Sequence, residues 1–156
     1  PRMRRAGLSN VHPIAIKTER DVRVKRLAGK FDRVLVDAPC SGTGTLRRNP
    51  DLRWRMSEEE LARINAIQAN LVKSGGRLVY ATCSLLREEN QGVVEAFLAK
   101  HPEYEIMDAT DVLAKQGVNL PDCAKAHAPF FVMAPHQSGT DGFFGAVLIK
   151  KEARDA

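Results

Sequence analysis

The sequence predicts an α/β domain in which parallel strands are joined by a helix. Residues 33–36 and 77–81 are short apolar runs typical of buried strands, and a helical pattern lies between them. A strand, a helix and a second strand in this order form a βαβ unit, whose two strands run parallel. The 156 residues are 44% hydrophobic and 28% charged, which is the composition of one globular domain.

The segment before the first strand gives weaker signals. Residues 1–7 are typical of the end of a helix, with Gly7 as its stop signal. Residues 10–16 alternate well enough for a strand, and Pro13 favours an edge position or an irregular start for it. The basic connection 17–30 is interpreted as a loop with one helical turn. Because the first residue is proline rather than methionine, the chain is expected to be a fragment.

The stretch Phe31–Gly44, FDRVLVDAPCSGTG, contains the first strand and the turn that ends it. Asp37 and Cys40 stand where this strand stops. Open parallel sheets bind ligands at the carboxyl ends of their strands, so an acid and a thiol at this edge indicate a site. On this segment alone, a tight turn with an ordinary small cysteine is an equally good interpretation.

Residues 45–55, TLRRNPDLRWR, combine arginines with a proline and a tryptophan. Basic residues interleaved with an aromatic ring can grip phosphates and stack on a base. A packed Trp54 with exposed arginines is an alternative of similar weight. The candidate RNA-binding residues are Arg47, Arg48, Arg53 and Arg55.

A capping box formed by Ser57 and Glu60 predicts the start of the connecting helix, and Gly75–Gly76 are expected to end it. The second strand, 77–81, is followed by the residues Thr82, Cys83 and Ser84.

The second cysteine changes the interpretation of the first. Neighbouring strands lie about 4.8 Å apart, so Cys40 and Cys83 are expected to face a common edge beside Asp37.

The remaining elements lie after the second strand. A helix is predicted over 87–100, and strands over 104–107, 130–133 and 143–149, the last two separated by a hairpin or loop. The segment 108–127 has no clear pattern, and Cys123 within it is expected to be structural.

Composition bounds the class of protein. The net charge of +5 and pI of about 9.3 suit a polyanion such as RNA, although solvated surface explains them equally well. The sequence has neither a long apolar run nor a signal segment, so we expect a cytoplasmic protein without a membrane span. Three widely spaced cysteines without a CxxC pair argue against a disulfide framework and a zinc site, so no metal is expected.

Several familiar site chemistries do not fit. Gly44 is followed by Thr45 rather than by the lysine of a P-loop, and CSGTG does not supply the GxSxG of a hydrolase. None of the four histidines lies in a motif that marks a base for a thiol hydrolase. Two thiols and a carboxylate without a histidine fit few reactions.

Five segments together resemble the Sun-type (Nop/Nol/Sun) RNA cytosine-C5 methyltransferases, over residues 1–149. Within this family the chain is most similar to the bacterial 16S ribosomal RNA methyltransferase B group. The resemblance implies a Rossmann-like methyltransferase fold that uses S-adenosylmethionine and acts on RNA, with 16S rRNA as the expected substrate. The segments are DAPCSGTG (37–44), RRNPDLRW (47–54), GGRLVYATCS (75–84), EEN (88–90) and TDGFF (140–144).

The resemblance also implies roles for three residues. C5 of cytosine is a poor nucleophile, and addition of a thiolate at C6 makes C5 able to attack a methyl sulfonium. By similarity this thiolate is Cys83, Asp37 donates a proton or hydrogen bond to N3, and Cys40 assists release of the methylated product.

The resemblance places the cofactor near Asp37 and Pro39, with Asp21, or else Glu19, near the adenine. The family's first strand and glycine-rich turn are expected before Pro1. Residues 1–150 are therefore interpreted as the C-terminal portion of one catalytic domain and 151–156 as a polar tail. The fragment alone is expected to bind the cofactor weakly or not at all, and to be inactive.

Two alternatives stay open: a noncatalytic RNA-binding module and a tRNA cytosine-C5 methyltransferase. An amino-group methyltransferase is disfavoured, because DAPC differs from the Asn/Asp-Pro-Pro-aromatic turn of those enzymes. The modified nucleotide and the oligomeric state do not follow from the sequence.

Overall fold

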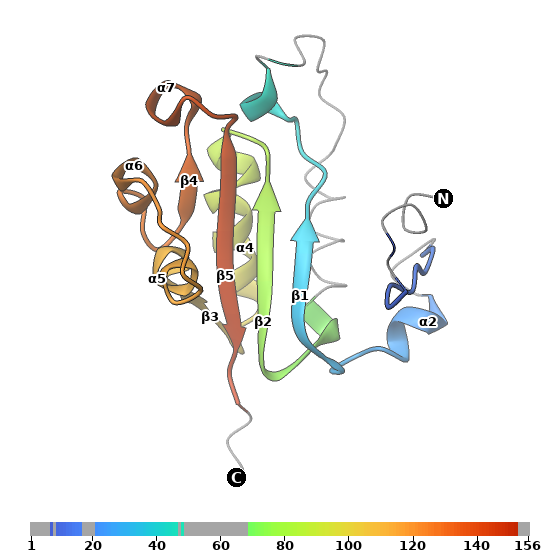
Figure 1. Cartoon of the computed structure of the whole chain (residues 1–156). Coiled ribbons are helices and arrows are strands. Elements are labelled where there is room, and N and C mark those ends of the chain that lie inside the picture. Colours follow the sequence, from blue (N-terminus) through green and yellow to red (C-terminus); the bar gives the residue numbers. More distant parts are fainter. Residues whose placement is uncertain (1–6, 8, 17–20, 47, 49–68, 153–156) are drawn as a thin grey trace.

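A mixed sheet forms the centre of the computed structural model, which describes residues 7, 9–16, 21–46, 48 and 69–152 (Figure 1). The strands are β1 (Phe31–Asp37), β2 (Val72–Thr82), β3 (Tyr104–Met107), β4 (Phe131–Met133) and β5 (Phe143–Lys150). The helices are α2 (Val22–Lys25), α4 (Gln91–Lys100), α5 (Ala109–Ala114), α6 (Asp122–Lys125) and α7 (Pro135–Ser138), with 3-10 helices η1 (Thr43–Thr45) and η2 (Arg87–Glu89).

Strands β1 and β2 pair in parallel, as the βαβ pattern predicts. Regular pairing runs from Arg33 opposite Arg77 to Asp37 opposite Ala81. β2 nevertheless begins at Val72, so the prediction that Gly75 and Gly76 end the preceding helix is wrong. Gly75 has a φ of +71°, and the register shifts in this part of the pair, which accommodates the extra residues before regular pairing starts.

The C-terminal strand β5 occupies the middle of the sheet. The strand order is β1-β2-β5-β3, and β5 runs antiparallel to β2, β3 and β4 (Figure 1). The predicted strands over 104–107, 130–133 and 143–149 are all confirmed within one residue at each end. The short helix α7 lies in the connection between β4 and β5, and α5 and α6 occupy the segment that had no clear pattern.

The predicted strand over residues 10–16 is wrong. The described segment 9–16 has no strand, and all its side chains are exposed. Alternation alone cannot form a strand, because the backbone N–H and C=O groups also need a paired neighbour, and Pro13 has no N–H to offer. The helical turn predicted before β1 is confirmed as α2.

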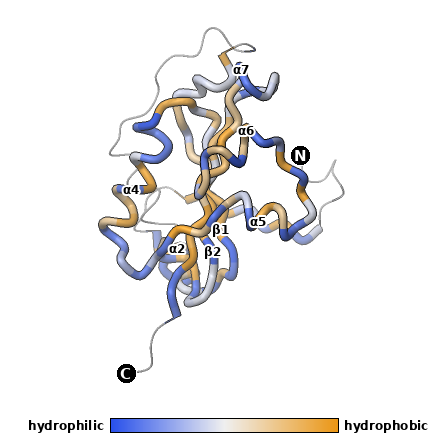
Figure 2. Tube along the Cα trace, turned by 90° about the vertical axis from the view of Figure 1, so that its left-hand side faces the viewer, coloured by the Kyte–Doolittle hydropathy of each residue, from blue (hydrophilic) through white to orange (hydrophobic). Residues whose placement is uncertain are grey.

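The hydrophobic core lies between the sheet and α4. Phe144 and Leu148 of β5 are almost fully buried, and Val94 and Phe97 of α4 pack against the same cluster. The ring of Phe97 meets Tyr104 of β3 edge to face, with 5.3 Å between centroids. Figure 2 shows hydrophobic residues gathered in the middle of the molecule, where the strands lie. No helix in the described ranges is long and apolar enough to cross a membrane.

Candidate active site

Two thiols meet at the carboxyl ends of β1 and β2. The Ala38 N–H donates to the Ala81 carbonyl at 2.9 Å, so the two strands stay paired up to their ends. The turns that follow bring Cys40 Sγ to 3.5 Å from Cys83 Sγ. Both side chains are partly exposed and both cysteines are free thiols. The structure therefore brings together the two cysteines that the sequence places at one edge.

The Cys83 thiol is electrostatically unlike a free cysteine. Burial, then the neighbouring Cys40 thiol, raise the pKa of Cys83 to about 11, and the charge of Asp37 adds to the effect. Cys83 is consequently a neutral thiol at pH 7 and must lose its proton before it can act as a nucleophile. The Asp37 side chain lies within electrostatic reach of Cys83, and Asp37 and Pro39 are both exposed at this edge.

The predicted cofactor residue Asp21 lies apart from the cysteines. It caps the N-terminus of α2, accepting the N–H of Arg23, and pairs with the Arg23 guanidinium. Figure 1 places α2 beside the amino-terminal end of β1. The alternative, Glu19, lies outside the described residues.

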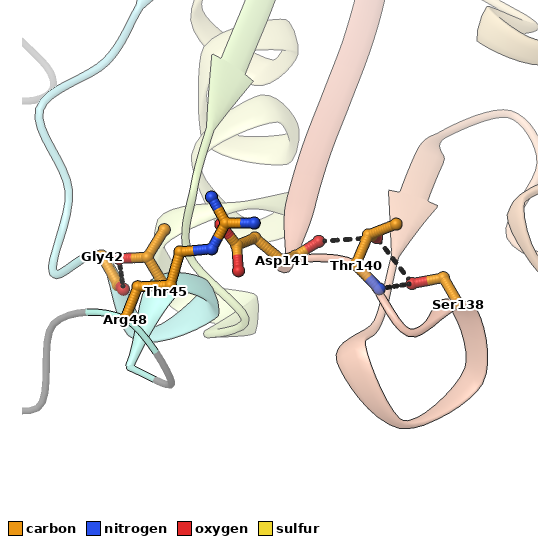
Figure 3. A network of polar contacts seen from close by, with 6 residues as sticks. All are labelled: Gly42, Thr45, Arg48, Ser138, Thr140 and Asp141. Carbon is orange, nitrogen blue, oxygen red and sulfur yellow. Dashed lines mark hydrogen bonds and ion pairs between the residues drawn. The ribbon is translucent and has the colours of Figure 1, made fainter.

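One of the four predicted RNA-binding arginines, Arg48, lies in the described part of the chain. Its Nε is 3.3 Å from Asp141 Oδ2, which joins the segment after η1 to the loop before β5 (Figure 3). Within the described residues, Asp141 Oδ1 is buried without a hydrogen-bond partner. The Arg48 side chain is 68% exposed, so it is still open to a ligand. Arg47, Arg53 and Arg55 lie outside the described residues.

Backbone contacts hold three loops together beside the thiols. The Gly44 N–H donates to the Cys83 carbonyl at 2.9 Å, and the Gly142 N–H donates to the Gly44 carbonyl at 2.8 Å. A Cβ at Gly44 would lie 2.6 Å from the Gly142 oxygen and 2.8 Å from the Cys83 oxygen, closer than real Cβ atoms come. The loops after β1, after β2 and before β5 thus approach as closely as backbones can.

A buried polar network lies under the two cysteine loops. The Glu89 carboxylate accepts the Ser41 N–H at 2.9 Å and the Ser41 hydroxyl at 2.7 Å. Asn90 accepts the Thr82 hydroxyl at 2.6 Å and donates to the Ser84 carbonyl at 2.9 Å. These five residues are all buried.

Sequence reasoning missed the part that Ser41, Glu89 and Asn90 play in this network. Glu89 and Asn90 belong to the EEN segment, which carries the family resemblance but received no role. The sequence offered one clue, which is that an acid and an amide follow the turn that carries the second cysteine. Their burial could not be predicted from the sequence, because glutamate and asparagine side chains are usually exposed.

The fold is the Rossmann-like fold of S-adenosylmethionine-dependent methyltransferases. It has a mixed sheet in which β5 runs antiparallel beside the parallel pair β1 and β2, with polar groups at the ends of these strands. A model of the family described as 16S rRNA methyltransferase RsmB/F matches residues 3–149, and the chain belongs to this family.

Known relatives agree with this membership. The ribosomal RNA small subunit methyltransferase B of Yersinia pseudotuberculosis is 40% identical over 129 residues, covering 78% of this chain and 27% of the relative. The protein of the same name from Yersinia pestis gives the same figures. The chain thus spans about a quarter of the length of these curated relatives.

Two solved structures share the fold. The crystal structure of PH0851 matches with a TM-score of 0.77 and 32% identity, covering 95% of this chain and 33% of that chain. The structure of NSun6 from Pyrococcus horikoshii with SFG matches with a TM-score of 0.71 and 25% identity, covering 97% and 37%.

Proposed function

We propose that this chain carries the catalytic cysteines of an RNA cytosine-C5 methyltransferase that uses S-adenosylmethionine and acts on 16S ribosomal RNA. The observation that carries the proposal is the pair of thiols 3.5 Å apart at the carboxyl ends of adjacent parallel strands. Family membership and the names of the curated relatives support ribosomal RNA over tRNA as the substrate. A purely RNA-binding module has no need for two facing thiols.

In the proposed reaction, Cys83 is the nucleophile. Its thiolate adds to C6 of the cytosine, forming an S–C6 bond and making C5 electron-rich. C5 takes the methyl group and then loses its proton to solvent. The electrons of the C5–H bond re-form the C5=C6 double bond as the S–C6 bond breaks, which returns the Cys83 thiolate and releases 5-methylcytosine. The base must leave its stack to reach a thiol at the edge of the sheet.

Asp37 and Cys40 serve the two halves of this cycle. Asp37 is exposed beside Cys83, where the protonated form of its carboxyl group donates a proton or hydrogen bond to N3 as charge builds on the ring during attack. Cys40, in contact with Cys83, assists elimination of Cys83 from the methylated base. Attack and release are therefore assigned to different side chains.

The residues present fit S-adenosylmethionine. Asp37 and Pro39 are exposed at the edge where α/β sheets bind ligands. Asp37 and Pro39 would hold the cofactor at this edge, whereas the place of Asp21 near the adenine stays a prediction from the resemblance. SFG, present in the related NSun6 structure, is an analogue of the same compound. When bound, the cofactor supplies the methyl group.

The assignment of the two thiols is tested by removing each in the full-length protein. We expect Cys83→Ala to abolish methyl transfer, whereas Cys40→Ala leaves a slowly released covalent RNA complex, visible on denaturing gels with labelled 16S rRNA. Cys123→Ala is the matched control and leaves both readouts unchanged. A trapped complex in Cys83→Ala but not in Cys40→Ala would reverse the assignment, and 5-methylcytosine formed in tRNA instead of 16S rRNA would contradict the substrate.

A further inference from the structure

Glu89 and Asn90 are adjacent in the chain, and each binds one of the two cysteine-bearing loops. Glu89 contacts Ser41, the residue directly after Cys40. Asn90 contacts Thr82 and Ser84, the residues on either side of Cys83. Neither Glu89 nor Asn90 is among the residues assigned to the reaction above.

The contact of Glu89 fixes the backbone next to Cys40. Both carboxylate oxygens lie within hydrogen-bond distance of the Ser41 N–H, at 2.9 and 3.2 Å, and one also accepts the Ser41 hydroxyl. The Ser41 N–H belongs to the peptide group between Cys40 and Ser41. The Glu89 carboxylate therefore fixes the orientation of the peptide group next to the Cα atom that carries the Cys40 side chain. The backbone of Glu89 is itself held by the Tyr80 hydroxyl, which donates to the Glu89 carbonyl at 2.6 Å.

The same carboxylate orients a chain of hydroxyl groups. Because Ser41 donates its hydroxyl proton to Glu89, Ser41 Oγ can only accept from Ser84 Oγ, 3.3 Å away. Ser84 Oγ also lies 3.2 Å from Thr43 Oγ1 and accepts the Leu86 N–H at 3.1 Å. The contact thereby reaches from the Cys40 loop into the Cys83 loop.

The contact of Asn90 fixes the backbone around Cys83. Its amide oxygen accepts from the Thr82 hydroxyl and its amide nitrogen donates to the Ser84 carbonyl, so a single side chain spans the turn that carries the thiol. Asn90 is 4% exposed, and the alternative for these groups is burial without a partner.

We propose that Glu89 and Asn90 are positioning residues that set the separation of the two thiols, Glu89 through the Cys40 loop and Asn90 through the Cys83 loop. The proposal deepens the proposed function by dividing the two halves of the cycle between them. Loss of the Glu89 contact impairs release of the product, and loss of the Asn90 contact impairs attack on the base.

The first test needs no RNA and does not depend on the proposed function. Diamide oxidises two adjacent thiols to a disulfide, taking up both hydrogens, and peptide mapping measures the rate of Cys40–Cys83 closure in the full-length protein. We expect Glu89→Ala to slow closure at least about tenfold, because the charge-assisted hydrogen bonds lost exceed the roughly 1.4 kcal/mol of one factor of ten. The exposed neighbour Glu88→Ala is the matched control and closes at the wild-type rate.

A conservative variant separates geometry from charge. In Glu89→Gln the amide oxygen can accept the Ser41 N–H while the amide nitrogen donates to Ser41 Oγ, so closure stays within about threefold of wild type. If Glu89→Ala fails to fold, Ser41→Ala, which removes the hydroxyl from the same contact, must still slow closure. Wild-type rates in a folded Glu89→Ala or in Ser41→Ala overturn the positioning role of Glu89.

The second test uses the covalent RNA complex. We expect Glu89→Ala to accumulate the complex on denaturing gels and Asn90→Ala to form it slowly, both with unchanged affinity for RNA. Equal slowing of formation and release in both variants indicates a merely structural role and overturns the division. Absence of any complex in Cys40→Ala contradicts the proposed function instead, while the disulfide rates still decide whether Glu89 positions Cys40.

Discussion

At the scale of single residues, Cys83 holds its proton at neutral pH. Burial and the adjacent Cys40 thiol raise the pKa of Cys83 to about 11, so the reactive thiolate is a minor species in the protein without RNA. Removal of this proton therefore contributes to the barrier to attack. The rate of attack should consequently depend on pH.

We expect the rate of covalent complex formation to rise about tenfold per pH unit between about pH 7 and 9, because the thiolate fraction rises in that proportion below the pKa. Cys40→Ala removes a neighbour that raises the pKa of Cys83, so its profile should shift to lower pH. Single-turnover gels across this range measure both. A flat profile in the wild-type protein would show that another group removes the proton before attack.

Single residues also mark how far the sequence could predict the site. The shared position of three residues at one edge of the sheet follows from the order of the strands, because parallel neighbours end at the same edge. These residues are Asp37, Cys40 and Cys83. Glu89 and Asn90 could not be assigned in the same way, because their contacts depend on loops that become neighbours only when the sheet forms. Asp21 was chosen by resemblance, and its place in the reaction stays a prediction.

At the scale of elements, the glycines Gly44 and Gly142 let three loops meet beside Cys83. The gap between these backbones has no room for a Cβ at Gly44. The position of the Cys83 carbonyl therefore depends on the absence of a side chain on another loop.

A methyl group at Gly44 should disturb the thiols as well as the fold. We expect Gly44→Ala to lower the free energy of unfolding by about 1–3 kcal/mol and to change the rate of Cys40–Cys83 disulfide closure. Gly117→Ala is the control, since its φ of +78° carries a strain of about 1–2 kcal/mol but nothing lies within 4 Å of the new Cβ. Denaturant unfolding and diamide oxidation measure the pair, and equal closure rates would contradict the loop contact.

The strands themselves were largely predictable from sequence. Apolar runs at β1 and at the regular part of β2 are long enough for burial and bounded by turn residues, and both predictions hold. Residues 10–16 show the limit, because their alternation is real but no paired strand accompanies it in the described structure. The central, antiparallel place of β5 also lay beyond local patterns, since strand order is decided by long-range pairing.

At the scale of the whole molecule, the net charge of +5 suits a polyanion such as RNA in general, whereas Arg48 is a predicted point of specific contact. Asp141 holds the Arg48 guanidinium by its Nε, while the side chain stays largely exposed. A specific contact of Arg48 with RNA can be distinguished from the general attraction due to net charge by removing one basic side chain at a time.

We expect Arg48→Ala to weaken RNA binding and to reduce the slope of log affinity against log salt concentration by about one. Lys125→Ala removes the same charge from α6, where Lys125 pairs with Asp122, and should change the slope less. Filter binding of 16S rRNA across a salt series measures both. Equal effects would mean that Arg48 acts only through the net charge.

The place of β5 has a consequence for how the protein is made. β5 follows the other described strands in the chain, yet it is the strand to which β2, β3 and β4 all pair. A ribosome releases the cysteine loops and the EEN segment well before β5, so the sheet cannot close around them while β5 is still inside the exit tunnel. Long-range pairing of this kind also folds slowly. We therefore expect the two thiols to reach their final spacing only after β5 has been synthesised, and a nascent chain stalled before β5 to expose both cysteines to alkylating reagents.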